Sequence, residues 1–221
     1  MPFAPLQSWL IEPTRGPGPA PLLILLHGVG ANETSLLGLA RGLDPRFAKL
    51  VVRSPLDFGP NAFGWFHVDF TPAGPVHAAA EAEAGRQQLA DFIPEAARAH
   101  GADPERVYLL GFSQGAIMAM SVLLTRPDLV AGAVAWSGRI LPEAVPQGQP
   151  VPLLALLAQR DALVVHGLHD ATLPVRHGRA SRDTLAGLGL RSVEYQELAM
   201  GHEVTRESLA LTQRWLGQRL D

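Results

Sequence analysis

The sequence predicts a doubly wound α/β domain, in which helices cover both faces of a mostly parallel sheet. Short apolar runs of strand length alternate along the chain with longer segments of helical character. Unbroken apolar runs are typical of parallel strands, because both faces of such strands are buried. The alternation of strands with helices implies right-handed crossovers, and we expect a single domain over residues 1–221.

The expected elements follow this alternation. The runs that predict strands are Leu22–Leu26, Leu50–Arg53, Val107–Leu110, Val130–Trp136, Leu163–His166 and Val193–Leu198. The segments long enough for helices are Ala78–His100, Gln114–Arg126, Val175–Leu188 and Glu203–Leu220. The Pro- and Gly-rich stretch Leu141–Pro152 predicts a long surface connection with room for a short helix. Ligands of doubly wound sheets bind beyond the carboxyl ends of the strands, so reactive residues are sought there.

Composition excludes several classes of function. The hydrophobic fraction of 47% against 18% charged residues fits a sizeable core and not a disordered chain. A net charge of −3 gives no global field that would favour nucleic acid or an anionic membrane. The chain has no cysteine, which excludes disulfides, cysteine nucleophiles and cysteine-based metal sites.

Neither a signal peptide nor a membrane span is expected. Met1–Ile11 lacks a basic region followed by a long apolar stretch. No window approaches the roughly 20 uninterrupted apolar residues that a spanning helix needs. We therefore expect a cytoplasmic protein. A homodimer stays open, since no decisive apolar stripe indicates one.

The strongest chemical motif is G-x-S-x-G at Gly111–Gly115, between an apolar strand and an apolar helix. This arrangement is a nucleophile elbow, in which a strained turn lifts the serine hydroxyl clear of the sheet. Glycines two residues on either side remove side chains that would collide in such a turn. We therefore predict Ser113 as a nucleophile. The alternative is a tight turn with an incidental serine.

Candidates for the acid and the base follow two later strands. Asp170 lies in the loop after the strand at Leu163–His166, and His202 lies in the loop after Leu198. An acid in this place can orient a histidine and stabilise its imidazolium, and the histidine can act as general base. The order serine, acid, histidine along the chain is that of α/β-hydrolases.

The other histidines have different interpretations. His166, His169 and Asp170 could form a metal motif, but a strand-to-loop spacing does not place these groups on one face. We expect His166 to be a core or edge histidine that is satisfied by hydrogen bonds. The remaining histidines lie in polar or helical context and are expected at the surface: His67, His77, His100 and His177.

The loop after the first predicted strand is a candidate oxyanion hole. The two donors would be the backbone N–H groups of Val29 and of Gln114, which follows the nucleophile. Gly28 and Gly30 would let the main chain approach a bound carbonyl closely. A nucleotide-binding interpretation fails, because the third glycine of G-x-G-x-x-G would fall at Glu33.

Taken together, these motifs resemble the bacterial phospholipase/carboxylesterase family, whose better-known relatives are acyl-protein thioesterases. The resemblance covers nearly the whole chain, with the motifs in the family's order and spacing. The segments that carry it are His27–Glu33, Gly64–Phe66, Gly111–Gly115, His166–Val175 and Met200–Glu203.

This resemblance implies an α/β-hydrolase fold without a large cap domain, and a shallow apolar groove beside Ser113. It also implies that Trp65 lines an acyl pocket and that Trp136 lies near the site, the alternative being ordinary aromatic core. One position departs from the pattern. Thioesterase relatives usually carry an aspartate where this chain has Ala31, which weakens an assignment to acyl-protein substrates.

The expected function is hydrolysis of carboxylic esters with short to medium acyl chains, through an acyl-enzyme on Ser113. This chemistry needs no cofactor or metal. Pocket depth depends on the loops Asp57–Pro75 and Leu141–Pro152. The first alternative is therefore a lysophospholipase or acyl-protein thioesterase for long acyl chains. Two others are a non-catalytic ligand-binding protein on the same fold, and a peptidase or acyltransferase on the same scaffold.

Overall fold

The computed structural model describes residues 6–14, 18–71, 74–148 and 151–221. The first five residues of Met1–Ile11 lie outside the described residues, as do residues 72–73 of the Asp57–Pro75 loop and 149–150 of the Leu141–Pro152 connection. The strands of the main sheet are β1 (Ser8–Ile11), β2 (Leu22–Leu26), β3 (Ala48–Val52), β8 (Val107–Phe112), β9 (Gly132–Trp136), β10 (Asp161–Gly167) and β11 (Ser192–Leu198). The α-helices are α1 (Thr34–Gly42), α2 (Ala79–Ala99), α3 (Gln114–Thr125), α4 (Val151–Leu157), α5 (Arg176–Gly187) and α6 (Arg206–Gly217).

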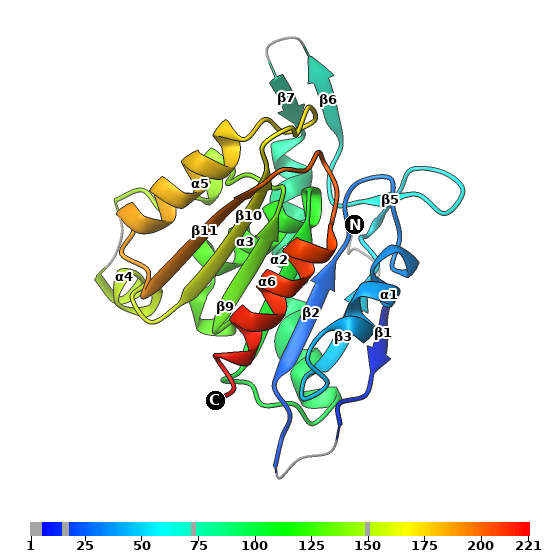
Figure 1. The fold of residues 1–221 in the computed structure, drawn as a ribbon, viewed down its shortest axis with the longest axis vertical. Coiled ribbons are helices and arrows are strands. Elements are labelled where there is room, and N and C mark those ends of the chain that lie inside the picture. Colours follow the sequence, from blue (N-terminus) through cyan, green and yellow to red (C-terminus); the bar gives the residue numbers. More distant parts are fainter. Residues whose placement is uncertain (1–5, 15–17, 72–73, 149–150) are drawn as a thin grey trace.

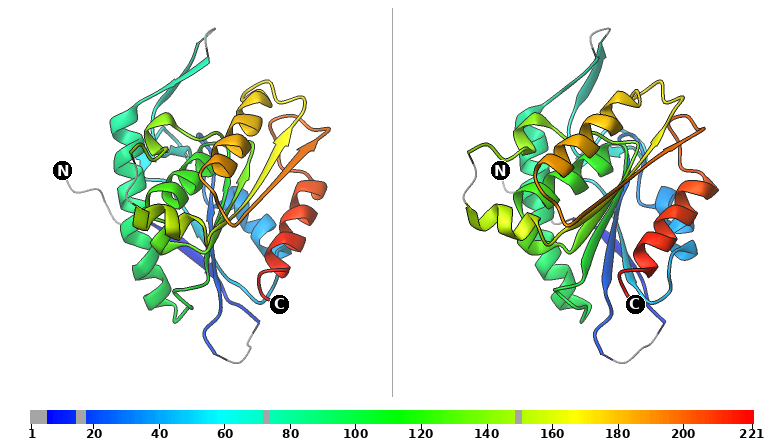
Figure 2. Two further views of the ribbon diagram at one scale, coloured as in Figure 1. Left: turned by 90° about the vertical axis from the view of Figure 1, so that its left-hand side faces the viewer. Right: turned by 60° about the vertical axis from the view of Figure 1, so that its left-hand side comes forward.

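The molecule has three layers, with the sheet in the middle (Figure 1). Its strand order is β1-β3-β2-β8-β9-β10-β11; β1 pairs antiparallel with β3, and the other neighbouring pairs are parallel. Helices α1 and α6 lie on one face, whereas α2, α3 and α5 lie on the other (Figure 2). The predicted fold class, a doubly wound and mostly parallel sheet with helices on both faces, is therefore confirmed.

The winding of the sheet fixes where its loops meet. From β2 the chain moves to one side, through α1 to β3, and then crosses back through α2 to β8 on the other side of β2. Because parallel crossovers are right-handed, this reversal puts α1 and α2 on opposite faces. The loops that follow β2 and β8 consequently diverge at the carboxyl ends of two neighbouring strands. Such a switch point is where ligands bind in open α/β sheets.

Each face of the sheet buries its own core. Along β2 all five residues are fully buried, and alternate side chains enter opposite cores. Leu22, Ile24 and Leu26 join the core with α2 and α3, while Leu23 and Leu25 join the core with α1 and α6. Burial on both sides explains why the strand reads as an unbroken apolar run.

Four short strands build the loops beyond β3. Strands β4 (Leu56–Asp57) and β5 (Phe63–Gly64) pair antiparallel, as do β6 (Val68–Thr71) and β7 (Gly74–His77). The β6–β7 hairpin projects from the end of the molecule toward which β2 points (Figure 1). Two 3₁₀ helices, η1 (Pro127–Leu129) and η2 (Pro142–Ala144), follow α3 and β9.

Several predicted elements differ from the structure at their ends. Helix α6 begins at Arg206 and not at Glu203, because Thr205 caps it and its side chain accepts from the Ser208 N–H. Helix α1 and strand β1 were not predicted. Strand β1 is half-buried along its whole length at the sheet edge, and its apolar run, Trp9–Ile11, is short.

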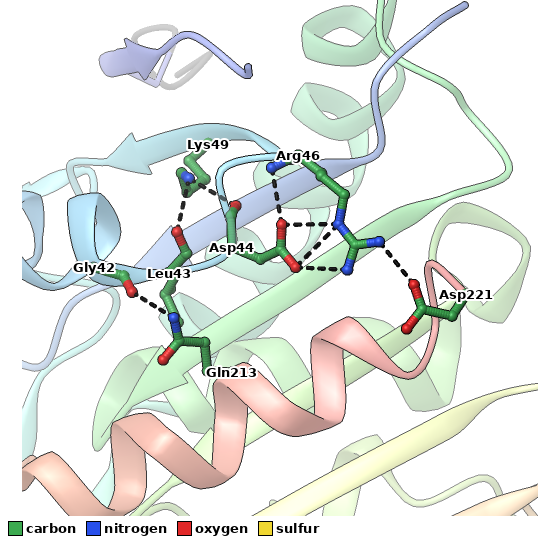
Figure 3. A network of polar contacts seen from close by, with 7 residues as sticks. All are labelled: Gly42, Leu43, Asp44, Arg46, Lys49, Gln213 and Asp221. Carbon is green, nitrogen blue, oxygen red and sulfur yellow. Dashed lines mark hydrogen bonds and ion pairs between the residues drawn. The ribbon is translucent and has the colours of Figure 1, made fainter. Parts of the chain in front are cut away.

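Polar contacts tie the C-terminal segment to the loop between α1 and β3 (Figure 3). Gln213 of α6 donates to the Gly42 carbonyl oxygen at 3.0 Å. Arg46 bridges Asp44 and Asp221, at 2.8 Å from an oxygen of each carboxylate. The chain's one lysine, Lys49, is buried and donates to two carbonyls of this loop, and burial lowers the pKa of its ammonium group.

At the amino end of β10 lies a second cluster. Asp161 forms ion pairs there with Arg191 and Arg219, at the opposite end of the strand from the carboxyl end, where the reactive residues are expected.

Among the described residues no helix is long and apolar enough to cross a membrane.

Candidate active site

Ser113 occupies the turn between β8 and α3 with the strained backbone that the motif predicts. Its φ of 53° lies in the left-handed region, and it is the N-cap residue of α3. A Cβ on Gly111 would lie 2.2 Å from the backbone of Gly115, and one on Gly115 would lie 2.1 Å from the Leu26 carbonyl oxygen. Only glycine fits at either position, so the turn can fold tightly against β2.

Ser113, His202 and Asp170 form a continuous chain of hydrogen bonds. His202 Nε2 lies 2.9 Å from Ser113 Oγ, and His202 Nδ1 lies 2.7 Å from Asp170 Oδ2. Since a carboxylate accepts, Nδ1 carries the proton and Nε2 is free to accept from the serine hydroxyl. The structure thus brings together three residues from loops far apart in the sequence, in the geometry of a nucleophile, base and orienting acid.

The loop after β10 holds the acid in a fixed position. Asp170 has a fully buried side chain, and its Oδ1 accepts from the backbone N–H groups of Thr172 at 3.0 Å and Leu173 at 2.7 Å. Its other oxygen is left for His202. The main chain therefore fixes the orientation of the carboxylate. Because the donors are neutral backbone N–H groups, no second cation competes with His202 for it.

His166 supports the same loop from inside the sheet. It is fully buried, and its Nε2 donates to the Leu173 carbonyl oxygen at 2.7 Å while lying 3.5 Å from Asp170 Oδ2. Burial lowers the pKa of the imidazole, which favours its neutral form. A Cβ on Gly178 would lie 2.7 Å from His166 Nδ1, so α5 packs directly on the ring. His166 is a core histidine, as expected, but its hydrogen bonds are not all satisfied, since the buried Nδ1 has no partner among the described residues; His169 beside Asp170 is exposed.

The two predicted oxyanion donors lie at the switch point. Val29 and Gln114 line the same hollow as Ser113, and neither backbone N–H has an acceptor within the part of the chain that the structure describes. A Cβ on Gly28 would lie 3.3 Å from the Ser113 Cβ, so the loop after β2 approaches the nucleophile closely. Unpaired N–H groups beside a nucleophile can stabilise a developing oxyanion.

The Gln114 side chain has a further role that the sequence did not indicate. It is buried, with Oε1 accepting from the Trp65 N–H at 2.6 Å and Nε2 donating to the Phe66 carbonyl oxygen at 2.7 Å. The side chain therefore fastens the segment after β5 to the nucleophile turn. Phe66 in turn lines the hollow beside Ser113.

Neither tryptophan side chain expected at the pocket lines the hollow, although Trp136 does lie near the site, where its backbone carbonyl oxygen accepts from the Ser113 N–H at 2.9 Å. Trp65 is 1% exposed and packs toward α2, where a Cβ on Gly85 would lie 3.4 Å from its ring. Trp136 is fully buried on the face covered by α6, where its indole N–H donates to Thr212 at 2.9 Å. Consecutive residues of an extended segment point to opposite sides, so Phe66 and not Trp65 faces the hollow.

The hollow beside Ser113 is small, with a volume of about 20 Å³. A larger cavity of about 570 Å³ adjoins it, since both are lined by Pro75 and Thr172. The small hollow is lined by Val29, Phe66, Val68, Pro75, Ser113, Gln114, Ile117, Arg139, Thr172 and Leu173. Its wall is mostly apolar, as the predicted groove is, but one member is a cation that the sequence did not single out.

Two histidines expected at the surface are partly enclosed near this cation. The His77 side chain is 15% exposed, because β7 lies against the loop that holds Glu143. His177 lies at the start of α5 with its Nε2 buried, and burial lowers the pKa of the ring. No group of three or more His, Asp or Glu side chains in the described ranges is arranged to hold a metal ion.

Comparison with known proteins gives the family. The model of the phospholipase/carboxylesterase family matches residues 10–219. The chain belongs to this family. Family relatives include proteins named esterase and acyl-protein thioesterase, which are ester-bond hydrolases. The resemblance predicted from the motifs is therefore confirmed.

Individual relatives differ in their identity to this chain and in how much of it they cover. The putative hydrolase MhqD of Bacillus subtilis is 37% identical over 115 residues, which are 51% of this chain and 54% of that protein. The chain thus spans about half the length of this relative. A rice protein named probable inactive carboxylesterase is 26% identical over 93% of this chain and 88% of its own length.

Among solved structures, the Bacillus cereus carboxylesterase matches with a TM-score of 0.81 and 20% identity, covering 96% of this chain and 94% of that one. At this identity the likeness shows the fold alone. This family member accordingly has the α/β-hydrolase fold that was expected.

Proposed function

We propose that this chain is a serine carboxylesterase, which hydrolyses short to medium acyl esters through an acyl-enzyme on Ser113. The single observation that carries the proposal is the hydrogen-bond chain from Ser113 through His202 to the buried Asp170. Family membership supports the reaction class, and this geometry supports the choice of residues. The same α/β domain supplies every group that the reaction needs.

The first half-reaction forms the acyl-enzyme. His202 Nε2 takes the proton as Ser113 Oγ attacks the acyl carbonyl, and Asp170 stabilises the imidazolium that results. The oxyanion of the tetrahedral intermediate accepts from the Val29 and Gln114 N–H groups. One such donor is typically worth about 3 kcal/mol of transition-state stabilisation. His202 then returns the proton to the leaving alcohol or thiol as the carbon–oxygen or carbon–sulfur bond breaks.

The second half-reaction repeats this sequence with water. His202 takes a proton from a water molecule, which attacks the acyl-enzyme carbonyl; collapse of the new intermediate releases the acid and restores the Ser113 hydroxyl.

The dimensions of the hollow favour short and medium acyl chains. The space beside Ser113 is small, so an acyl chain that outgrows it would extend into the adjoining cavity. Three of the seven described residues that line that cavity, Thr71, Thr172 and Arg176, are polar or charged. A long alkyl chain would therefore bury less apolar area there than in a wholly apolar groove, and the hydrophobic gain scales with that area.

A p-nitrophenyl ester series from acetate to palmitate tests the proposal. We expect activity to peak at short or medium chains, and Ser113→Ala to lower kcat by about 10⁴-fold or more. Ser35→Ala, on the exposed face of α1, is the matched control. Near-normal turnover by Ser113→Ala would refute the assignment of the nucleophile.

Two other outcomes would change the proposal. Activity that rises to the longest chains would favour a lysophospholipase or thioesterase. Absence of both turnover and fluorophosphonate labelling would favour a non-catalytic ligand-binding protein.

A further inference from the structure

Arg139 is the one cationic residue among the described residues that line the hollow beside Ser113. It follows Ser137, whose φ of 49° turns the chain at the end of β9, and Gly138. A Cβ on Gly138 would lie 2.6 Å from the Ala116 Cβ, so this turn packs directly on the first turn of α3. The packing holds Arg139 close to the nucleophile, which heads the same helix.

The guanidinium is only partly satisfied by the protein. Nη2 makes long contacts with the Pro75 carbonyl oxygen at 3.4 Å and with His77 Nδ1 at 3.3 Å. Nε is buried and has no acceptor among the described residues. Nη1 also lacks an acceptor among the described residues, but unlike Nε it is not buried.

The nearest carboxylate does not neutralise this cation by contact. Glu143 accepts from His77 Nε2 at 2.5 Å, on the opposite side of the imidazole from Arg139. His77 therefore stands between the two charges, with Nε2 donating to Glu143 and Nδ1 accepting from Arg139. Asp170, the buried acid of the region, is already engaged by His202 and two backbone N–H groups, whereas Glu143 is exposed.

An unpaired donor on a partly buried cation is costly, which calls for an explanation. Burial lowers the pKa of Arg139, in the direction expected for a cation without a close counter-ion. A guanidinium binds a carboxylate through paired N–H groups, and the interaction is strong where water is excluded. A neutral alkyl chain would leave these donors without an acceptor.

We propose that Arg139 selects substrates with a free carboxylate a few bonds from the scissile carbonyl, so that this esterase prefers short anionic esters to neutral ones of the same shape. This inference rests on the proposed esterase function. Arg176 lines the adjoining cavity as a second cation, which favours approach of an anion.

Matched ester pairs test the preference on each side of the scissile bond. On the acyl side, monoethyl glutarate is compared with ethyl 5-methylhexanoate. On the alcohol side, the butanoyl ester of 3-hydroxypropanoic acid is compared with isopentyl butanoate. In each pair an isopropyl group replaces the carboxylate. Acid release in a pH-stat gives the ratio of kcat/KM, anionic over neutral, for the native protein and for each variant.

We expect a ratio well above one in at least one pair, and a fall of that ratio by about 10- to 100-fold in Arg139→Gln. Arg139→Lys keeps the charge but not the paired donors, so it should restore the ratio only in part. Arg41→Gln, at the exposed end of α1, is the control and should keep the native ratio.

A native ratio near one in both pairs would overturn the inference, as would a high ratio that survives in Arg139→Gln. Neither result touches the proposed function, because the neutral esters would still be hydrolysed. Failure to hydrolyse all four esters, together with no fluorophosphonate labelling of Ser113, would instead refute the esterase.

Discussion

At the scale of single residues, Gln114 combines two tasks at one position. Gln114 lines the hollow and its backbone N–H is a candidate oxyanion donor, while its side chain binds the backbone of Trp65 and Phe66. The motif G-x-S-x-G places no demand on the residue after the serine beyond its N–H. The side chain therefore serves the pocket wall, because it fixes the segment from which Phe66 lines the hollow.

Gln114→Leu removes both side-chain hydrogen bonds and leaves the backbone N–H unchanged. We expect a loss of about 2–4 kcal/mol in the free energy of unfolding, since two buried backbone groups lose their partners. KM should rise as well, because Phe66 is no longer held. Urea denaturation and steady-state kinetics measure the two effects. Gln87→Leu, on the exposed side of α2, should change neither; equal effects in both variants would contradict this role.

At the scale of elements, caps and close approaches decide where helices begin. Helix α6 starts with a capping box, in which Thr205 Oγ1 accepts from the Ser208 N–H at 3.2 Å and Ser208 Oγ accepts from the Thr205 N–H at 2.9 Å. The loop that carries His202 ends at this cap. A well-defined start of α6 therefore also limits the motion of the loop that carries His202.

Thr205→Ala should lower the free energy of unfolding by about 1 kcal/mol, because it removes the acceptor for a helix N–H. Thr205→Ser keeps that acceptor and should recover most of the loss. Thermal or urea unfolding of the three proteins gives the comparison. Equal stabilities of Thr205→Ala and Thr205→Ser would mean that the cap hydrogen bond contributes nothing.

At the scale of the whole molecule, buried histidines link stability to pH. His27 is buried, with Nε2 accepting from the Ser54 N–H at 3.1 Å and Nδ1 donating to the Gly28 carbonyl oxygen at 2.8 Å. A second proton on the ring, at Nε2, would place an N–H donor opposite the Ser54 N–H, which is also a donor. Burial lowers the pKa of both His27 and His166 below the ordinary 6.5.

The unfolded chain consequently binds more protons than the folded one between these lowered values and pH 6.5. Stability should fall as pH drops from 7 toward 5, by up to about 1.4 kcal/mol per pH unit for each such histidine. Urea denaturation across this range measures the slope. In His27→Gln the slope should be smaller; a slope identical to the native one would show that His27 does not titrate on unfolding.

The sequence predicted much of the fold, for identifiable reasons. Strand β2 was predicted with its observed bounds, since burial on both faces produces an unbroken apolar run. Strand β1 was missed because its stability comes from antiparallel pairing with β3, about 40 residues away, and not from local pattern. Helix α6 was predicted to begin three residues early, at Glu203, whereas Thr205 is the cap.

By itself the sequence determined which reactive residues are candidates. These are a serine in a turn that only flanking glycines permit, and an acid and a histidine that each follow a later strand. Those features are local, so they can be read without coordinates. Only the tertiary structure decided which atoms meet. It brought His202 Nε2 to 2.9 Å from Ser113 Oγ, turned Phe66 instead of Trp65 toward the hollow, and set Arg139 in its wall. Such outcomes depend on strand order and on the packing of loops, which no pattern within one segment specifies.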